Sequence, residues 1–231
     1  MSQTPFRILF AIYPGMTQLD FTGPYQFLKR WAGGEVIVAS LTGGDVQADG
    51  LVFAKNLCLA EISDCDLICV PGGTTALDVA LDADFVTQIH RLGRSARYVT
   101  SVCTGSLILG AAGLLQGRRA ACHWAWRELL PLFGAIPDSG RVVRDGHIIT
   151  GGGVTAGIDF ALALLAEIAG PDVAQTIQLG LEYAPDPPFK CGRPEEAPLE
   201  ILNAYQAQIS PLAAKRYAQA QGAAARLTAL T

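Results

Sequence analysis

The fold is decided by the stretch Tyr98-Val99-Thr100-Ser101-Val102-Cys103-Thr104-Gly105-Ser106-Leu107-Ile108-Leu109-Gly110. Its first half is apolar and β-branched, which predicts a buried strand. Its second half consists of small and apolar residues, which predict a tightly packed helix. Cys103 stands between the two, so the sequence predicts a sharp strand-to-helix turn, a nucleophile elbow, with a cysteine at its apex.

Such a turn favours a reactive cysteine for two physical reasons. The unpaired amides and the dipole at the start of the helix favour the thiolate form of Cys103. The side chain also stands at the carboxyl edge of the sheet, where ligands bind in open α/β sheets. We therefore expect Cys103 to be a nucleophile. The alternative is a buried structural cysteine, since cysteine is among the most buried residue types.

Strands and helices alternate along the rest of the chain. The pattern predicts strands over 7–13, 35–40, 66–70 and 98–102, a hairpin over 142–150, and helices over 25–31, 76–81, 85–92, 105–115, 124–130, 158–168 and 172–182. This alternation predicts an α/β protein with a mostly parallel sheet and helices on both faces. We expect residues 1–190 to form this domain. Residues 191–231 are expected to form an arm and a helical tail, packed on the same domain or on a dimer partner.

Glycine-rich turns follow two of the predicted strands. Gly72 and Gly73 come directly after the strand over 66–70, and Gly151-Gly152-Gly153 follows the hairpin. Glycine allows backbone N–H groups to approach a ligand closely. An anion pocket built from the amides of Gly73 and Thr104 is therefore one interpretation. A plain strand-to-helix turn is the other.

Asp20 lies after the first predicted strand, at the same edge of the sheet as Cys103. Its apolar neighbours Leu19 and Phe21 favour partial burial, which would keep the carboxyl protonated and able to donate a proton. The alternative is a helix N-cap or a solvated loop residue. His123 is a second candidate for a base beside Cys103, although packing against Trp124 is the simpler interpretation.

The composition excludes several classes of function. The 231 residues carry 17 Lys and Arg against 21 Asp and Glu, for a net charge of −4, and no basic run suggests a nucleic acid or membrane partner. The first residues lack a secretory pattern, so we expect a cytoplasmic protein with reduced cysteines. The six cysteines form no CxxC pair and the three histidines show no ligand spacing against them, so no metal site is expected.

On these motifs the chain resembles the DJ-1/PfpI superfamily, and within it the isocyanide hydratases. The resemblance extends from about residue 7 to 188 and is carried by Leu19-Asp20-Phe21-Thr22-Gly23-Pro24, Val70-Pro71-Gly72-Gly73, Ser101-Val102-Cys103-Thr104-Gly105-Ser106 and the segments 150–160 and 181–185. It implies a flavodoxin-like three-layer sandwich, usually a homodimer. It also implies hydration of an isocyanide (isonitrile) to an N-substituted formamide, without a cofactor or a metal.

The resemblance also implies roles for single residues. Cys103 would be the nucleophile, and Asp20 the acid that hydrogen-bonds its sulfur and moves protons. Backbone amides of Thr104, Gly73 and the adjoining Gly72 would lie near the reacting atoms, and Gly152 would lie close to the site on the helix-packing side.

The chain departs from other branches of the superfamily. Thr104 stands where peptidase-like members have histidine, and Asp20 where glyoxalase-like members usually have glutamate. Only some forty residues follow Pro188, which is short for the DNA-binding module of the regulator branch. The expected chemistry is thiolate attack, a thioimidate on Cys103, addition of water and release of formamide. A non-catalytic thiol redox sensor and a glyoxalase-like carbonyl enzyme are the alternatives.

Overall fold

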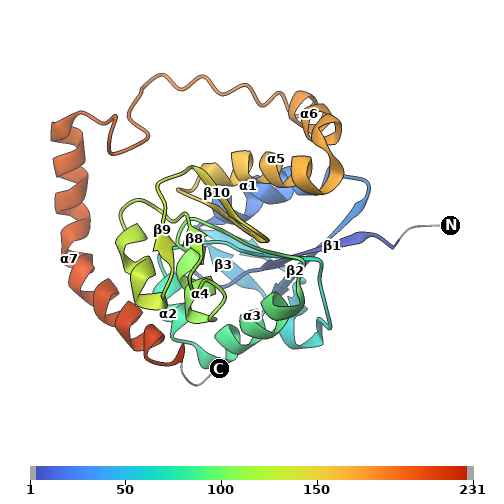
Figure 1. Ribbon diagram of the computed structural model, residues 1–231, viewed down its shortest axis with the longest axis horizontal. Helices are drawn as coiled ribbons and strands as arrows, with labels where there is room; N and C mark the ends of the chain where they lie inside the picture. The colour runs from blue at the N-terminus through green and yellow to red at the C-terminus, as the bar shows by residue number, and fades with distance from the viewer. Residues whose placement is uncertain (1–3, 228–231) are drawn as a thin grey trace.

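A seven-stranded sheet runs through the middle of the computed structural model, which describes residues 4–227 (Figure 1). Its strand order is β10-β11-β7-β6-β1-β2-β5. All neighbours pair in parallel except β10, which runs antiparallel to β11 at one edge. The strands are β1 Phe6–Ala11, β2 Gly34–Ser40, β5 Leu57–Cys58, β6 Leu67–Val70, β7 Tyr98–Val102, β10 Val142–Asp145 and β11 Ile148–Gly151.

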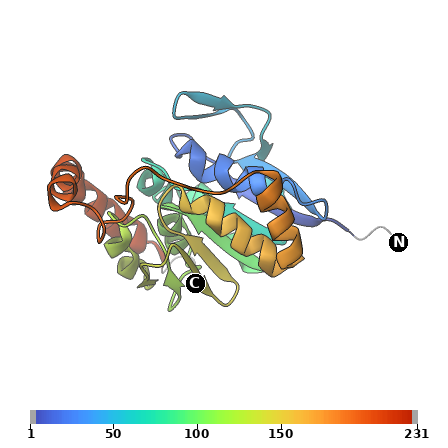
Figure 2. The same cartoon turned by 90° about the horizontal axis from the view of Figure 1, so that it is seen from above.

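Helices cover both faces of this sheet (Figures 1 and 2). One face carries α1 Gln18–Leu28, α5 Ala156–Ala169 and α6 Pro171–Gly180, and the other carries α2 Ala76–Ala80, α3 Ala83–Ser95 and α4 Gly105–Ala111. Burial from both sides explains why the central strands are continuous apolar runs rather than alternating ones. The predicted α/β sandwich with a mostly parallel sheet is confirmed.

Short elements complete the described chain. They are the pairs β3 Val46–Ala48 with β4 Leu51–Phe53 and β8 Arg119–Ala120 with β9 Ile136–Pro137, and the 3-10 helices η1 Leu59–Glu61 and η2 Arg127–Phe133. The predicted helix over 124–130 is therefore wrong in type and position. Pro131 lies inside η2, where i to i+3 hydrogen bonds such as Leu129 N to Trp126 O at 3.1 Å hold the turn.

The first helix also begins earlier than predicted, at Gln18 instead of residue 25. A carboxylate oxygen of Asp49, on the β3–β4 turn, accepts a hydrogen bond from Gln18 N at 2.8 Å and satisfies one of the helix's unpaired amides. Asp20 therefore lies in the first turn of α1 rather than in a loop. Pro24 lies inside the helix, packed against Gly157 of α5.

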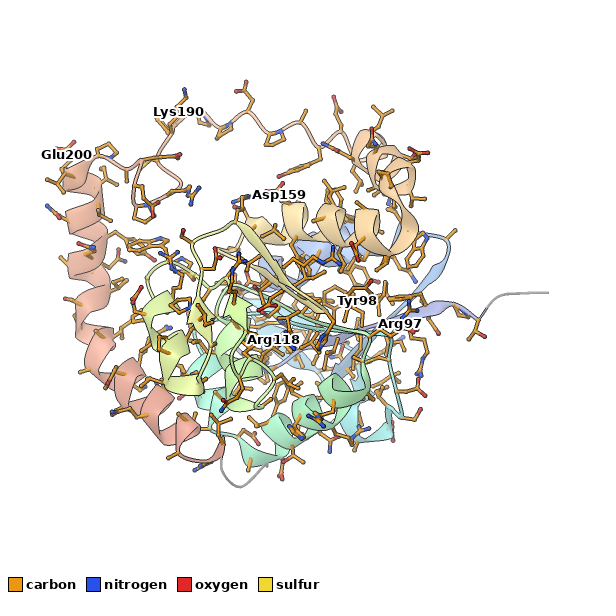
Figure 3. All side chains as sticks on the ribbon, viewed as in Figure 1. Arg97, Tyr98, Arg118, Asp159, Lys190 and Glu200 are labelled. Atoms are coloured by element: carbon orange, nitrogen blue, oxygen red, sulfur yellow. The ribbon has the colours of Figure 1, made fainter. Side chains whose placement is uncertain are left out.

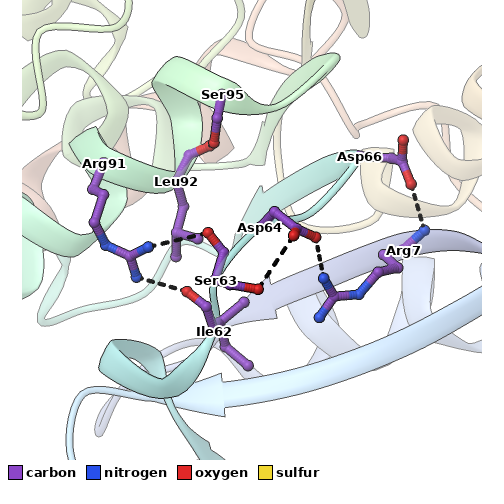
Figure 4. Close-up of polar contacts among 8 residues, drawn as sticks. All are labelled: Arg7, Ile62, Ser63, Asp64, Asp66, Arg91, Leu92 and Ser95. Carbon is purple, nitrogen blue, oxygen red and sulfur yellow. Dashed lines mark hydrogen bonds and ion pairs between the residues drawn. The ribbon is translucent and has the colours of Figure 1, made fainter.

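Charged contacts hold the amino-terminal edge of the sheet, where β1 and β6 begin (Figure 4). The backbone N–H of Arg7 donates to Asp66 at 2.9 Å, and the Arg7 guanidinium pairs with Asp64. Arg91 of α3 donates to the carbonyl groups of Leu59 and Ile62 at 3.0 and 2.9 Å. These contacts fix the edge of the sheet opposite to the one where Cys103 lies.

The last helix, α7 Leu199–Ala224, stands at the carboxyl ends of the parallel strands (Figure 1). An irregular arm joins it to α6, and in Figure 3 Lys190 on this arm and Glu200 at the start of α7 lie at the outside of the molecule. The carboxyl half of α7 contacts α2 through Gln219, which donates to Asp78 at 2.5 Å, and Arg226, just after the helix, donates to the carbonyl of Leu81 at 2.5 Å. Two short segments lie outside the described chain. They are residues 1–3, which belong to the segment searched for a secretory pattern, and residues 228–231 of the predicted tail.

Within residues 4–227, no helix has both the length and the apolar character that a membrane span requires.

Candidate active site

Cys103 occupies the turn between β7 and α4, as the sequence predicted. Its backbone has a φ of 59°, a left-handed conformation that residues other than glycine rarely adopt. Two groups of neighbours hold it there. Cys103 N donates to the carbonyl of Gly151 at the end of β11 at 3.0 Å, and the Ser106 hydroxyl bonds Ser101 Oγ at 3.0 Å and the Ala121 carbonyl at 2.5 Å. Strain of this kind persists only where the surroundings over-determine it.

The carboxyl group of Asp20 lies beside this cysteine and is fully buried. Its Oδ2 accepts a hydrogen bond from the N–H of Gly72 at 3.0 Å. Its Oδ1 meets no donor at hydrogen-bond distance among the described residues. The Cys103 thiol is the side chain that interacts with this carboxyl and shifts its pKa. The structure therefore brings Asp20 and Cys103 together at the edge of the sheet.

The two groups shift each other's protonation. Burial raises the pKa of Asp20 from 3.8 to about 7, although the interaction with the Cys103 thiol and the hydrogen bond from Gly72 act in the other direction. Burial, followed by the negative charge of Asp20, raises the pKa of the Cys103 thiol well above its usual value. The backbone N–H of Thr104 lowers that pKa, but by less. The amide at the helix start thus favours the thiolate, as the sequence predicted, but burial acts more strongly in the opposite direction.

The three backbone amides predicted to face a ligand have different partners. Thr104 N–H interacts with the Cys103 sulfur. Gly72 N–H is used by Asp20, and Gly73 N–H donates to the Thr104 hydroxyl at 2.9 Å, which in turn donates to the Gly73 carbonyl at 3.1 Å. The amides of Gly72 and Gly73 therefore position the site residues instead of standing unpaired toward a ligand.

Residue 72 must be glycine because three groups converge on it. A Cβ atom there would lie 2.5 Å from Thr104 N, 2.7 Å from Thr104 Oγ1 and 2.8 Å from Asp20 Oδ2. Those distances are shorter than van der Waals contact. The glycine lets the Asp20 carboxyl and the Thr104 amide approach the same sulfur.

Cys103 opens onto a pocket of about 270 Å³. The residue is only 5% exposed, so the pocket reaches Cys103 through a narrow opening. The lining comes from three parts of the chain: Thr17, Gly73, Thr74, Cys103 and Thr104 at the sheet edge; His123, Trp126 and Val154 from the neighbouring loops; and Tyr205, Ile209, Leu212 and Arg216 from α7.

The contribution of α7 is absent from the sequence-based prediction, which described the tail only as helical and alanine-rich. The signal was present in the spacing, because positions 205, 209, 212 and 216 recur at the helical period and so share one face. Nothing local to the tail shows which part of the domain that face covers.

His123 lines the same pocket, and its contacts agree with packing rather than with a base for Cys103. Its ring stacks on Trp124 with centroids 5.8 Å apart, and its Nδ1 accepts a hydrogen bond from Ala125 N at 3.3 Å. Burial and the nearby charge of Arg216 lower its pKa, so the ring is neutral at physiological pH.

Gly152 is near the site without lining it. Its N–H donates to the carbonyl of Arg141 at 2.9 Å. It borders a neighbouring pocket of about 250 Å³, which shares His123 and Val154 with the pocket of Cys103. The structure thus places Gly152 in the lining of the adjoining pocket, which is linked to the pocket of Cys103 by these two shared residues.

The raised pKa of Asp20 has a consequence for stability. Folding favours the protonated carboxyl, so the contribution of Asp20 to the free energy of unfolding is greatest below pH 3.8. Between pH 3.8 and about 7 the carboxyl ionises in the unfolded state but not in the folded state, and this contribution falls. Above about pH 7 the carboxyl is ionised in both states, and the contribution stops falling. The total loss is about 4 kcal/mol, at about 1.4 kcal/mol per pKa unit. We expect the unfolding free energy of Asp20→Asn, which cannot ionise, to rise relative to that of the wild type between about pH 4 and pH 7, and the difference to level off above pH 7.

Urea denaturation of both proteins at several pH values measures this difference in unfolding free energy. The other carboxyl groups titrate alike in both proteins, so their effects cancel in the difference. A difference that stays constant over this range would show that Asp20 is not buried in the folded state.

Comparison with known proteins agrees with the fold and the site. Residues 6–167 match the model of the DJ-1/PfpI family. The chain is 46% identical over 222 residues to the isonitrile hydratase of Pseudomonas putida, which covers 96% of this chain and 97% of that protein. It is 31% identical over 180 residues to the HTH-type transcriptional regulator CdhR of Pseudomonas aeruginosa, across 71% of this chain and 51% of the regulator.

A solved structure agrees as well. The crystal structure of a ThiJ/PfpI family protein from Pseudomonas syringae superposes with a TM-score of 0.91 at 39% identity, covering 94% of this chain and 91% of that one. The parallel sheet, the cysteine at its carboxyl edge and the family match over most of the sequence lead to one conclusion. The chain belongs to the DJ-1/PfpI family.

Proposed function

We propose that this protein hydrates isocyanides to N-substituted formamides, with Cys103 as nucleophile and Asp20 as general acid and base. The observation that carries the proposal is the 46% identity to an isonitrile hydratase over almost the whole of both chains. The site supports it, because the buried carboxyl of Asp20 lies beside the thiol that lines the pocket.

The first half of the reaction uses one proton held between the two side chains. Above pH about 7 the Asp20 carboxylate can accept the proton of the Cys103 thiol. The sulfur then bonds to the terminal carbon of the isocyanide, and Asp20 delivers the proton to that same carbon. The product is a thioimidate on Cys103, and Asp20 is again a carboxylate.

The second half adds water to the thioimidate carbon. Asp20 takes a proton from the water as its oxygen bonds to that carbon, and then delivers this proton to the substrate nitrogen. The carbon–sulfur bond then breaks with its electron pair going to sulfur, and the hydroxyl proton returns to the pair of Cys103 and Asp20. The formamide leaves, and the Thr104 N–H stabilises the departing sulfur.

Incubation of the protein with phenyl isocyanide tests this proposal directly. We expect N-phenylformamide to accumulate catalytically, and rapid acid quenching to trap a mass increase equal to one isocyanide on the peptide that contains Cys103. Formamide without any dependence on the protein, or an adduct confined to another cysteine, would contradict the proposal.

The glyoxalase-like alternative predicts turnover of methylglyoxal but not of an isocyanide, so the same assay with both compounds separates the two functions. The redox-sensor alternative requires a thiolate that oxidises readily. Burial raises the pKa of Cys103, which lowers its thiolate fraction and disfavours this alternative.

Further proposals concern organisation. We propose that residues 1–190 form the catalytic domain, that 191–231 form an arm and tail, and that the protein is a cytoplasmic homodimer. Leu199 and Ile201, at the start of α7, are 70% and 51% exposed, and Phe189 on the arm is 78% exposed. A second copy that buried these apolar side chains would support the dimer.

A further inference from the structure

The guanidinium group of Arg216 lines the pocket of Cys103 from the side of α7. It is half-buried and is held in two ways. Its Nη2 lies 3.4 Å from the carbonyl of Thr74, and its Cζ lies 4.2 Å from the centre of the Trp126 ring. These contacts fix the direction of the side chain but leave most of its five N–H donors unused by them.

This cation has no carboxylate partner within the described part of the chain. Asp78 is the acidic residue whose charge acts on it, and the Asp78 carboxylate accepts a hydrogen bond from Gln219 at 2.5 Å instead. Burial lowers the pKa of Arg216, which reflects the loss of water around the charge. A partly desolvated cation without a counter-ion is unfavourable unless a bound anion completes it.

The pocket combines the thiol of Cys103, the cation of Arg216 and apolar lining from Trp126, Val154, Ile209 and Leu212. Its other polar side chains, among them Thr17, Thr74, Thr104, His123 and Tyr205, carry no full charge that would compete with Arg216 for an anion. A guanidinium matches a carboxylate geometrically, because two parallel N–H groups meet its two oxygens.

We propose that the pocket selects isocyanides whose substituent carries a carboxylate, which Arg216 binds while the terminal carbon meets the Cys103 sulfur. This inference rests on the proposed hydration and adds the class of substrate. Arg216 is then a specificity-determining residue that binds the substituent of the substrate rather than the reacting carbon.

A matched pair of substrates tests the proposal: 4-isocyanobenzoate and its neutral isostere 4-isocyanobenzamide. We expect the wild type to prefer the benzoate by about 10- to 100-fold in kcat/KM, the range of a charge-assisted hydrogen bond. Arg216→Met keeps a long apolar stem against Trp126. It should remove the preference, because turnover of the benzoate should fall at least about tenfold more than turnover of the benzamide.

Two control variants sharpen the result. Arg216→Lys should keep part of the preference, because it keeps the charge without the two parallel donors. Arg226→Met removes another arginine near the end of α7, one that binds the Leu81 carbonyl rather than lining the pocket, and should leave the preference intact. An equal loss for both substrates in Arg216→Met, or an unchanged preference, would overturn the proposal.

A binding experiment separates this inference from the proposed hydration. Calorimetry with Cys103→Ala should show 4-formamidobenzoate binding at least about tenfold more tightly than 4-formamidobenzamide, and Arg216→Met in that background should abolish the difference. Binding preference without hydration of either isocyanide would contradict the proposed function alone. Hydration of both compounds without any carboxylate preference would contradict the inference alone.

Discussion

Cys103→Ala is expected to abolish hydration of isocyanides, with a fall in kcat of at least about 10⁴-fold. The substitution removes the atom that forms the covalent bond, and no other described side chain that lines the pocket is a thiol. The measurement is formamide production from phenyl isocyanide under single-turnover and steady-state conditions. The variant should also fail to trap the isocyanide adduct seen by mass spectrometry in the wild type.

The matched control is another buried cysteine. Cys122 is 2% exposed and influences the pKa of Cys103, yet it borders the neighbouring pocket instead of the one that contains Cys103. We expect Cys122→Ala to retain activity within about tenfold, with a loss of thermal stability typical of a small core truncation. If activity survived in Cys103→Ala and disappeared in Cys122→Ala, the nucleophile would be Cys122 and the proposed role of Cys103 would be contradicted.

A serine variant then distinguishes chemistry from packing. Cys103→Ser keeps the size of the side chain and the left-handed turn, but a hydroxyl has a far higher pKa and is a weaker nucleophile for a soft carbon. Its activity should also fall by about 10³-fold or more, while thermal unfolding stays within a few degrees of the wild type. A folded but inactive protein is the result that assigns the sulfur a chemical role.

The sequence predicted the parts of this molecule that depend on local pattern. The buried strands β1, β6 and β7 are apolar runs ended by proline, glycine or the cysteine turn, so their type followed from composition alone. The meeting of Asp20 and Cys103 followed from topology. Both residues follow parallel strands whose carboxyl ends share one edge.

Features that depend on distant contacts were not predictable in this way. The start of α1 depends on Asp49 from the β3–β4 turn, about thirty positions away along the chain. The raised pKa of Cys103 depends on burial by the whole domain, which opposed the local effect of the helix start. Arg216 reaches the pocket only because α7 folds back over the sheet edge more than a hundred residues later in the sequence.

Asp20→Asn is expected to lower kcat/KM for isocyanide hydration by about 10²- to 10⁴-fold, the usual contribution of a positioned acid and base. The asparagine amide still accepts the hydrogen bond from Gly72 N–H, so the local structure should persist. It cannot take the thiol proton or deliver it to the substrate carbon. The reaction would then depend on the thiolate form of Cys103, which is a small fraction because the pKa of the thiol is raised.

The pH profile shows why the carboxyl is needed and how its role can be recognised. Below pH about 7 the wild-type pair holds two protons, so the carboxyl no longer accepts from the thiol and kcat/KM should fall about tenfold per pH unit. That acid limb should be absent from Asp20→Asn, whose rate should instead rise steadily toward the high pKa of the thiol. An unchanged acid limb in the variant would show that another group supplies the base.

The same substitution should therefore act in opposite directions on stability and on activity. Above pH 7 the wild type keeps a carboxylate in a buried site where it is unfavourable, and Asn relieves that cost while removing the proton acceptor. If Asp20 served only in packing, its replacement would make the protein less stable. If it served only in solubility, it would lie at the surface. A variant that is more stable at pH 8 but nearly inactive leaves proton transfer as the reason why this position carries an aspartate.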